Sequence, residues 1–150
     1  LPSLAETPLA RFEDYVLSLK GRWSGQGVVQ LLDGRQMQAK CVATYFVAAD
    51  GREIKQNLRC RNDDFQLSFS GHGFVDGNSI TGTWKENKYE ISGTFGGSYQ
   101  PGVMVMQAES RNTGAIITVT SSGCEQVVEI APMDAQKMGV TTISGTMRKC

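Results

Sequence analysis

The sequence predicts an all-β fold, in which an antiparallel up-and-down meander of about eight to ten strands closes into a barrel, with one short N-terminal helix. Three observations support this fold class. Apolar and polar residues alternate with period two through most of the chain after Gly21. Turn-forming pairs such as Asp33-Gly34 and Asp50-Gly51 separate the alternating segments. Because short strands with short connections must hide their edges, a closed barrel is favoured over the alternative, a two-sheet sandwich.

The length and charge of the chain limit its organisation and its partners. At 150 residues it is the size of one domain, so we expect a single exported domain over residues 1–150, with a helix at 7–20 and a barrel at 22–149. Fifteen basic residues balance fifteen acidic residues and are scattered along the chain, which predicts no nucleic-acid binding. No apolar run approaches the length of a membrane span. We expect a monomer.

Cysteine usage indicates the compartment. None of the four cysteines lies in a C-x-x-C pair, and His72 is the only histidine, so two disulfides are favoured over a zinc site. Disulfides persist in oxidising compartments, which predicts a periplasmic or secreted protein. The chain starts at Leu1 without an initiator Met, as a removed signal peptide or a cloning boundary would leave it. We expect no metal and no cofactor.

The N-terminal segment carries helix signals. Thr7 can cap free backbone N–H groups, and Pro8 suits the first helical position. Four apolar residues then recur at helical spacing on one side: Leu9, Phe12, Val16 and Leu19. Gly21 is placed to end the run. A helix this short is marginal alone, so we expect it to plug one barrel end; a partner-binding helix is the alternative.

The first two turns fix a register. A three-residue loop with Gly34 in the left-handed conformation keeps alternate residues of the next strand on the face of Trp23. These residues are Met37, Ala39, Cys41 and Ala43. Asp50-Gly51, as a two-residue turn, places Cys41 opposite Cys60, and opposed residues lie within reach of a disulfide. Cys124 and Cys150 remain for the second disulfide.

Residues 80–95 form the clearest hairpin pattern. With Glu86-Asn87 as a two-residue turn, Trp84 is expected opposite Tyr89, on the apolar face. Trp84 is therefore predicted to be a core residue. Farther along, Gly96 to Gly102 is interpreted as a glycine-rich loop, and residues 132–139 as a longer connection. Four more strands are expected: Val103 to Glu109, Ala115 to Thr120, Cys124 to Ile130 and Val140 to Arg148.

The sequence provides little evidence of catalysis. His72 lies between two glycines near an expected turn, and no G-x-S-x-G elbow accompanies it. We therefore interpret His72 as an exposed turn residue and expect no catalytic residues. A catalytic His72 would instead lie in a cleft, with a carboxylate or hydroxyl within hydrogen-bond reach.

The apolar face carries the functional hypotheses. Four residues on it are candidate ligand contacts: Met37, Tyr45, Met104 and Met106. Glycines thin the wall, so a cavity for a small apolar ligand is one interpretation and a filled structural core is another. A third is a disulfide-pinned barrel whose loops bind another protein, which would require an exposed apolar patch such as one around Tyr99-Gln100-Pro101.

Two resemblances extend this picture. Gly21-Arg22-Trp23 resembles the G-x-W start of lipocalins and other calycin barrels. That resemblance implies a lipocalin-like (calycin-like) barrel, with Trp23 at a closed end and a basic residue of the last strand, here Arg148, over its ring. Three segments within Phe12 to Gly97 are similar to small exported alphaproteobacterial proteins of unknown function. They are Gly21–Gly27, Leu58–Cys60 with Cys41, and Ile80–Glu86 followed by Ser92-Gly93. This second resemblance implies an envelope location and no particular activity.

Overall fold

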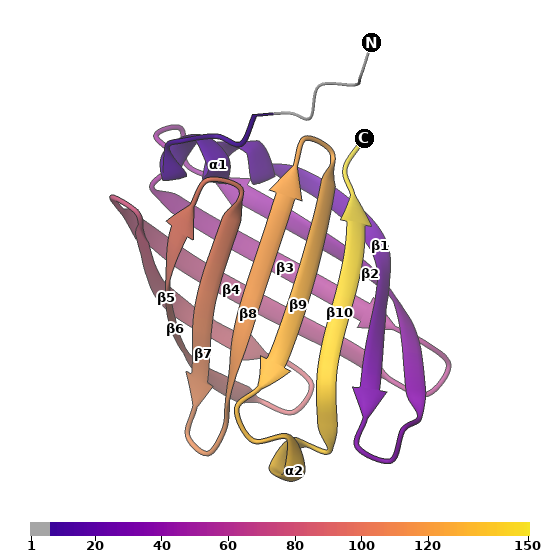
Figure 1. Ribbon diagram of the computed structural model, residues 1–150. Helices are drawn as coiled ribbons and strands as arrows, with labels where there is room; N and C mark the ends of the chain where they lie inside the picture. Colours follow the sequence, from indigo (N-terminus) through magenta and orange to yellow (C-terminus); the bar gives the residue numbers. More distant parts are fainter. Residues whose placement is uncertain (1–6) are drawn as a thin grey trace.

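The computed structural model describes residues 7–150 and has the predicted fold class, a closed antiparallel barrel of ten strands with a short helix at one end (Figure 1). The strands follow one another in chain order, and β1 pairs with β10 to close the barrel. The elements are α1 (Phe12–Leu19), β1 (Gly21–Leu31), β2 (Gln36–Val47), β3 (Glu53–Arg61), β4 (Gln66–Asp76), β5 (Ser79–Glu86), β6 (Ile91–Gln100), β7 (Val103–Ser110), β8 (Gly114–Ser122), β9 (Glu125–Pro132), α2 (Ala135–Met138) and β10 (Val140–Arg148).

The helix α1 is shorter than predicted. It begins at Phe12, and Arg11 occupies the N-cap position without a side-chain capping bond, so the expected start at Thr7 is wrong. Tertiary contacts fix the preceding residues instead: the backbone carbonyl of Leu9 accepts a hydrogen bond from the Tyr99 hydroxyl. The buried face consists of Phe12, Tyr15, Val16 and Leu19, whereas Leu9 is exposed.

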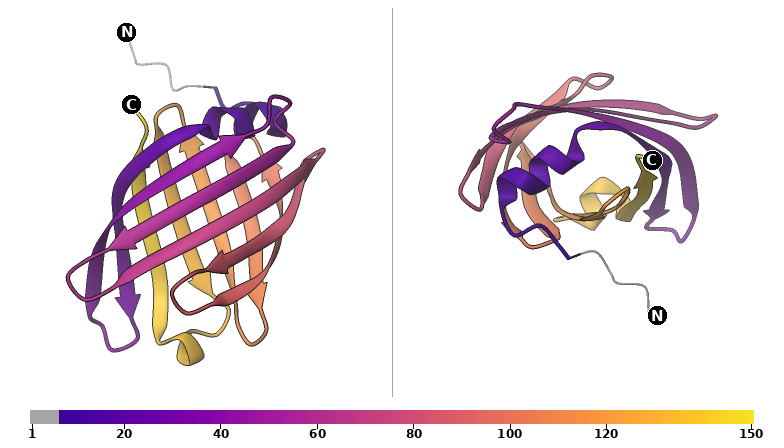
Figure 2. Two further views of the ribbon diagram at one scale, coloured as in Figure 1. Left: turned by 180° about the vertical axis from the view of Figure 1, so that it is seen from behind. Right: turned by 90° about the horizontal axis from the view of Figure 1, so that it is seen from above.

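α1 covers one end of the barrel, as predicted (Figure 2). The ring of Phe12 stacks on that of Tyr99, with centroids 4.9 Å apart. Trp23 is fully buried beneath the helix, and its indole N–H donates to the carbonyl of Leu19 at 2.8 Å. Tyr99 is buried too, so the predicted exposed patch around residues 99–101 is not formed by its ring.

The basic residue beside Trp23 is Lys149 rather than Arg148. Met147 faces inward, so alternation turns Arg148 outward, where its guanidinium lies 3.6 Å from Glu125 and remains largely exposed. The ammonium group of Lys149 lies 5.2 Å from the centre of the Trp23 ring. The expectation for Arg148 is therefore wrong by one residue.

Both predicted registers at the first two turns are confirmed. Trp23 pairs with Ala43 across a loop in which Gly34 has φ 90°, and Cys41 pairs with Cys60. Both predicted disulfides are present, joining Cys41 to Cys60 and Cys124 to Cys150.

The register predicted for the β5–β6 hairpin is wrong. Trp84 pairs with Gly93, and Glu86 pairs with Ile91, so four residues form the turn. The carboxylate of Glu86 accepts backbone N–H groups of Lys88 and Tyr89 within that turn, which favours it over a two-residue turn.

The predicted glycine-rich loop at 96–102 is also wrong, because β6 continues to Gln100. Gly97 lies where a Cβ would come 2.3 Å from the Val105 carbonyl oxygen, so its glycine permits close approach of β7. His72 lies within β4 and not near a turn.

Candidate functional site

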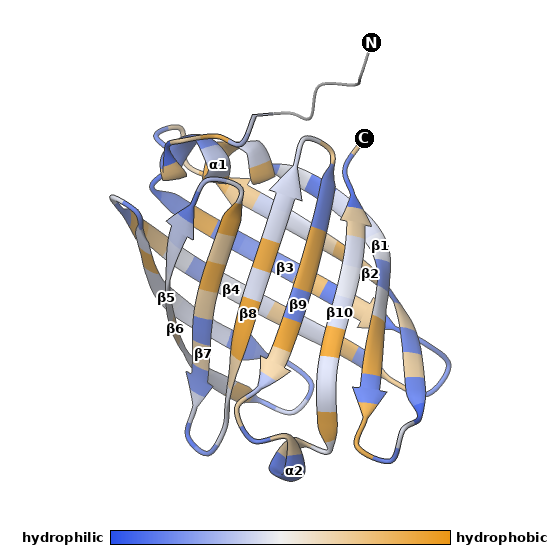
Figure 3. Ribbon diagram, in the orientation of Figure 1, coloured by the Kyte–Doolittle hydropathy of each residue, from blue (hydrophilic) through white to orange (hydrophobic). Residues whose placement is uncertain are grey.

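The two faces of the barrel wall differ in charge. Residues opposed in a register share a face, so the ten pairings assign each strand position to the inside or the outside. The lysines, arginines and histidine on the strands of the described chain all face outward: Arg22, Lys40, Lys55, Arg59, Arg61, His72, Lys85 and Arg148. Glu86 is the one inward-facing strand residue between 7 and 150 that carries a full charge. Figure 3 shows the corresponding alternation of apolar and polar residues along the strands.

Burial of the inward-facing side chains decreases along the barrel axis. Near α1 six apolar ones are buried: Val75, Ile80, Tyr99, Met104, Val119 and Met147. Val47 and Ile54 at this end are only partly buried, whereas Ala39 and Glu86, farther away, are buried. Farther from α1 they are only partly buried: Met37, Leu58, Leu67, Phe69, Phe95, Met106, Ile117 and Ile130. Ile91, at the far end of β6, is 43% exposed although it faces inward. All of these partly exposed side chains lie on the inner side of the barrel wall.

A recess interrupts the inner wall at Gly71. Gln56, Gly71 and Trp84 are direct neighbours across β3, β4 and β5. A Cβ on Gly71 would have atoms of only Gln56 within 4 Å, the nearest being Oε1 at 3.8 Å. The Trp84 indole lies toward β6, where its Cε2 atom is 3.0 Å from a Cβ position on Gly93, and it donates to the carbonyl of Thr94 at 3.2 Å. Trp84 is partly buried and lies outside the buried cluster, so its predicted core role holds only in part.

A chain of polar groups leads from α1 to this recess. The Gln56 amide donates to the Tyr45 hydroxyl at 3.0 Å, and that hydroxyl donates to Gln126 Oε1 at 3.4 Å. Gln126 donates to the Ser121 hydroxyl at 3.5 Å. The Ser121 hydroxyl in turn lies 3.0 Å from the hydroxyl of Tyr15. Burial raises the pKa of both tyrosines, so their hydroxyls remain protonated at neutral pH.

The four predicted ligand contacts all face inward, in two different environments. Met37 and Met106 are partly buried and line the more accessible part of the lumen. Tyr45 and Met104 are buried, 8% and 7% exposed, and belong to the packed core near α1. Gln56 was not among the predicted contacts, although alternation places it on the same face as Tyr45.

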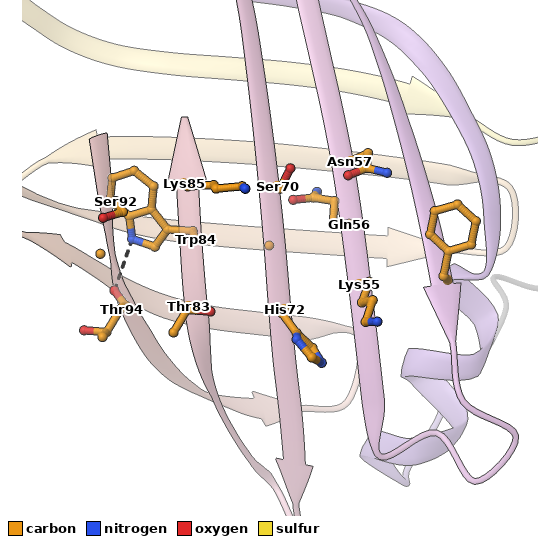
Figure 4. Close-up of a pocket in the computed structure, with 13 residues that line it drawn as sticks. Lys55, Gln56, Asn57, Ser70, His72, Thr83, Trp84, Lys85, Ser92 and Thr94 are labelled. Carbon is orange, nitrogen blue, oxygen red and sulfur yellow. Dashed lines mark hydrogen bonds between the residues drawn. The ribbon is translucent and has the colours of Figure 1, made fainter. Parts of the chain in front are cut away.

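A second concavity lies outside the barrel (Figure 4). It is a shallow groove of about 750 Å³, lined mainly by outward residues of β3–β6, with Phe46 of β2 at one edge. Four residues of the inner wall also border it: Gln56, Gly71, Trp84 and Gly93. Its side chains include two lysines, one histidine and several hydroxyls: Lys55, Lys85, His72, Ser70, Thr83, Ser92 and Thr94.

His72 has one of the partners that a catalytic histidine needs. Its Nε2 lies 2.8 Å from Glu53 Oε2, and both side chains are more than a third exposed. Among the described residues, no hydroxyl or thiol is hydrogen-bonded to His72. The groove is open to water, so the geometry of an activated nucleophile is incomplete.

The fold gathers basic residues that are scattered in the sequence. The outward positions of β1–β5 carry six lysines and arginines: Arg22, Lys40, Lys55, Arg59, Arg61 and Lys85. We call this outward surface the basic face. Within residues 7–150, none of the six forms an ion pair, and the acidic residues at outward positions of the same strands are Glu53 and Asp76. Acidic side chains lie instead on β7–β9, at Glu109, Glu125 and Glu129.

No group of three or more His, Cys, Asp or Glu residues in the described chain is arranged to hold a metal ion. Over residues 7–150, no helix combines the length and apolar character needed to cross a membrane.

Comparison with solved structures identifies two similar folds. Rv2717c from Mycobacterium tuberculosis is 12% identical, with a TM-score of 0.73, and the match covers 95% of this chain and 99% of that one. A DUF3598-family protein of unknown function from Nostoc punctiforme is also 12% identical, with a TM-score of 0.67. That match covers all of this chain and 52% of the longer protein. Such low identity establishes similarity of fold alone. No protein-family model matches the sequence, and no curated protein does.

Proposed function

We propose that this protein is a non-enzymatic barrel that binds a small apolar ligand in its lumen, through the end opposite α1. The observation that carries the proposal is the decrease in burial of inward-facing apolar side chains with distance from α1. A filled core would bury those side chains to a similar extent along the whole barrel.

Barrel size supports the same conclusion. The interior of an eight-stranded barrel is just wide enough to be filled by side chains or to hold one small ligand, and the diameter grows with strand number. This barrel has ten strands, and many of its inward positions carry only small residues. Those positions are Gly25, Gly27, Ala39, Ala43, Gly71, Gly73, Gly82, Gly93, Gly97, Ala108, Ala115 and Gly145. The side chains of Phe95, Trp84 and Met106 cover three of them, Gly82, Gly93 and Gly97, whereas Gly71 has atoms of only Gln56 within 4 Å of a Cβ position.

An exported location fits this proposal. Two disulfides suit an oxidising compartment, and the resemblance to small exported proteins points to the same location. We therefore propose a periplasmic or secreted location.

Gly71 offers a direct test, because a larger side chain there would occupy the recess. N-phenyl-1-naphthylamine, an uncharged probe that fluoresces in apolar surroundings, would be titrated into purified protein freed of bound molecules. We expect saturable fluorescence that Gly71→Leu weakens at least tenfold. Gly96→Leu is the matched control, since Gly96 faces outward on β6 and a Cβ there would have only one atom within 4 Å.

Two results would count against lumen binding. An absence of probe fluorescence with the wild-type protein would favour a filled structural core. Equal binding by Gly71→Leu and wild type would place the probe elsewhere on the molecule.

An acidic protein partner is the second candidate function, and the basic face favours it over binding through loops. Poly-L-glutamate would serve as a probe of acidic polypeptide at low salt. Paired Lys55→Gln and Lys85→Gln changes should weaken its binding, whereas Lys137→Gln, in the short helix α2, should not. Equal loss of poly-L-glutamate binding in the Lys55/Lys85 variant and in the Lys137 variant would indicate a general charge effect and would exclude this candidate function.

A further inference from the structure

We infer that the lumen ligand is uncharged and carries a hydrogen-bonding group, such as a hydroxyl, which binds to Gln56 in the recess at Gly71. This inference rests on the proposed function and specifies the chemistry of its ligand.

The lumen has no partner for an anion. No inward-facing strand residue between 7 and 150 is lysine, arginine or histidine. A ligand carboxylate would therefore lose its hydration without gaining a compensating charge. Fatty acids and other apolar anions are disfavoured for this reason.

A cationic ligand has no free counter-charge either. Glu86 is the inward-facing carboxylate, and backbone groups already occupy it. Its Oε1 accepts N–H groups of Ser68 at 3.3 Å and Lys88 at 3.0 Å, and its Oε2 accepts that of Tyr89 at 2.6 Å. These bonds hold the β5–β6 turn, so pairing with a ligand cation would disrupt it.

Gln56 is the polar group available to the ligand. Its amide nitrogen donates one hydrogen to Tyr45, which leaves its second N–H and its carbonyl oxygen without a partner in the described chain. The carbonyl oxygen lies 3.8 Å from where a Cβ of Gly71 would be, so it borders the recess. Tyr45 in turn donates to Gln126, which donates to Ser121, and these bonds hold the Gln56 amide in place. An amide that offers one donor and one acceptor matches a hydroxyl, which has both.

Retinol and retinoic acid would test this inference, because they share one apolar skeleton and differ in a hydroxyl or a carboxylate. At pH 8 we expect the full disulfide-bonded protein to bind retinol at least tenfold more tightly than retinoic acid. The methyl ester of retinoic acid, which is uncharged, should recover most of the lost affinity. Equal affinities for retinol and retinoic acid would overturn the inference.

Substitutions at Gln56 provide the second arm. Gln56→Lys places a cation in the recess and should reverse the preference, so that retinoic acid binds more tightly than retinol. Asn57→Lys is the matched control: it adds the same charge one residue away, on the outward face, and should leave the preference unchanged. Reversal by both variants, or by neither, would contradict a role for Gln56.

Gln56→Leu provides the test if the lysine variant does not fold. It should weaken retinol binding several-fold and change the affinity for N-phenyl-1-naphthylamine by a smaller factor. Unchanged retinol binding would exclude Gln56 as the anchor. Failure of the proposed function looks different, because in that case none of these probes binds to the wild-type protein.

Discussion

The ammonium group of Lys149 lies 5.2 Å from the centre of the Trp23 ring and donates to the carbonyl of Ser18 at 2.6 Å and that of Lys20 at 3.2 Å. One side chain thus joins the C-terminal segment both to the end of α1 and to the tryptophan beneath it. The adjacent disulfide between Cys124 and Cys150 holds the same segment.

Lys149 should therefore contribute to stability, and Arg148 should not. We expect Lys149→Met to lower the free energy of unfolding by about 1–2 kcal/mol, through loss of the cation–π contact and two hydrogen bonds. Arg148→Met removes only an exposed ion pair and should cost less than about 0.5 kcal/mol. Urea denaturation of both variants measures this, and equal effects would contradict the assignment.

The two tryptophans should differ in their contribution to stability. Trp23→Ala, at a fully buried site, should cost about 3–5 kcal/mol. Trp84→Ala should cost about half as much, because the indole of Trp84 is already partly exposed to the lumen. Denaturation curves that give Trp84→Ala the larger loss would indicate a filled lumen around it.

Glu86 should make the stability of the protein depend on pH in the acidic range. Although desolvation opposes its ionisation, the N–H groups of Tyr89, Lys88 and Ser68 hold its pKa below the ordinary value of 4.5. Because the pKa of Glu86 is lower in the folded state than in the unfolded state, its ionised form stabilises the fold above about pH 4.5. This stabilisation is lost as the pH falls through the pKa of the folded state. We expect Glu86→Gln to lower Tm by about 2–4 °C at pH 7, with the difference shrinking below pH 4. A difference that stays constant down to pH 3 would contradict this role.

Gln126, at the centre of the chain of polar groups, should contribute to the free energy of unfolding. It is 1% exposed and bonded to both Tyr45 and Ser121. Gln126→Leu leaves two buried hydroxyls short of a partner, so we expect a loss of about 2–4 kcal/mol. Tyr45→Phe in the same background should restore part of that loss, because it removes one of the stranded hydroxyls. Strictly additive losses in the double variant would indicate that the chain is not coupled.

Local signals in the sequence were sufficient for the barrel and its cysteines. Asp33-Gly34 and Asp50-Gly51 are strong turn pairs, and the register they impose places Cys41 opposite Cys60. Glu86-Asn87 lacks such a signal, and the side chain of Glu86 holds a longer turn by hydrogen bonds that turn preferences do not predict.

Features that depend on distant strands could not be predicted in the same way. Tyr45 and Gln126 are separated by 81 positions, so local sequence patterns do not predict their hydrogen bond. The basic face has the same origin, because its residues come from outward positions of four strands and meet only when those strands pair. Strict alternation from Met147 would, however, have placed Lys149 inward instead of Arg148.

The most direct test of the lumen as a ligand site is a crystal structure of the protein with 1-iodonaphthalene, an uncharged apolar probe whose iodine is located by anomalous scattering. We predict an iodine peak inside the barrel, in contact with Trp84 and the recess at Gly71. Iodine peaks only in the outer groove, or no peak at all at saturating probe, would contradict the account.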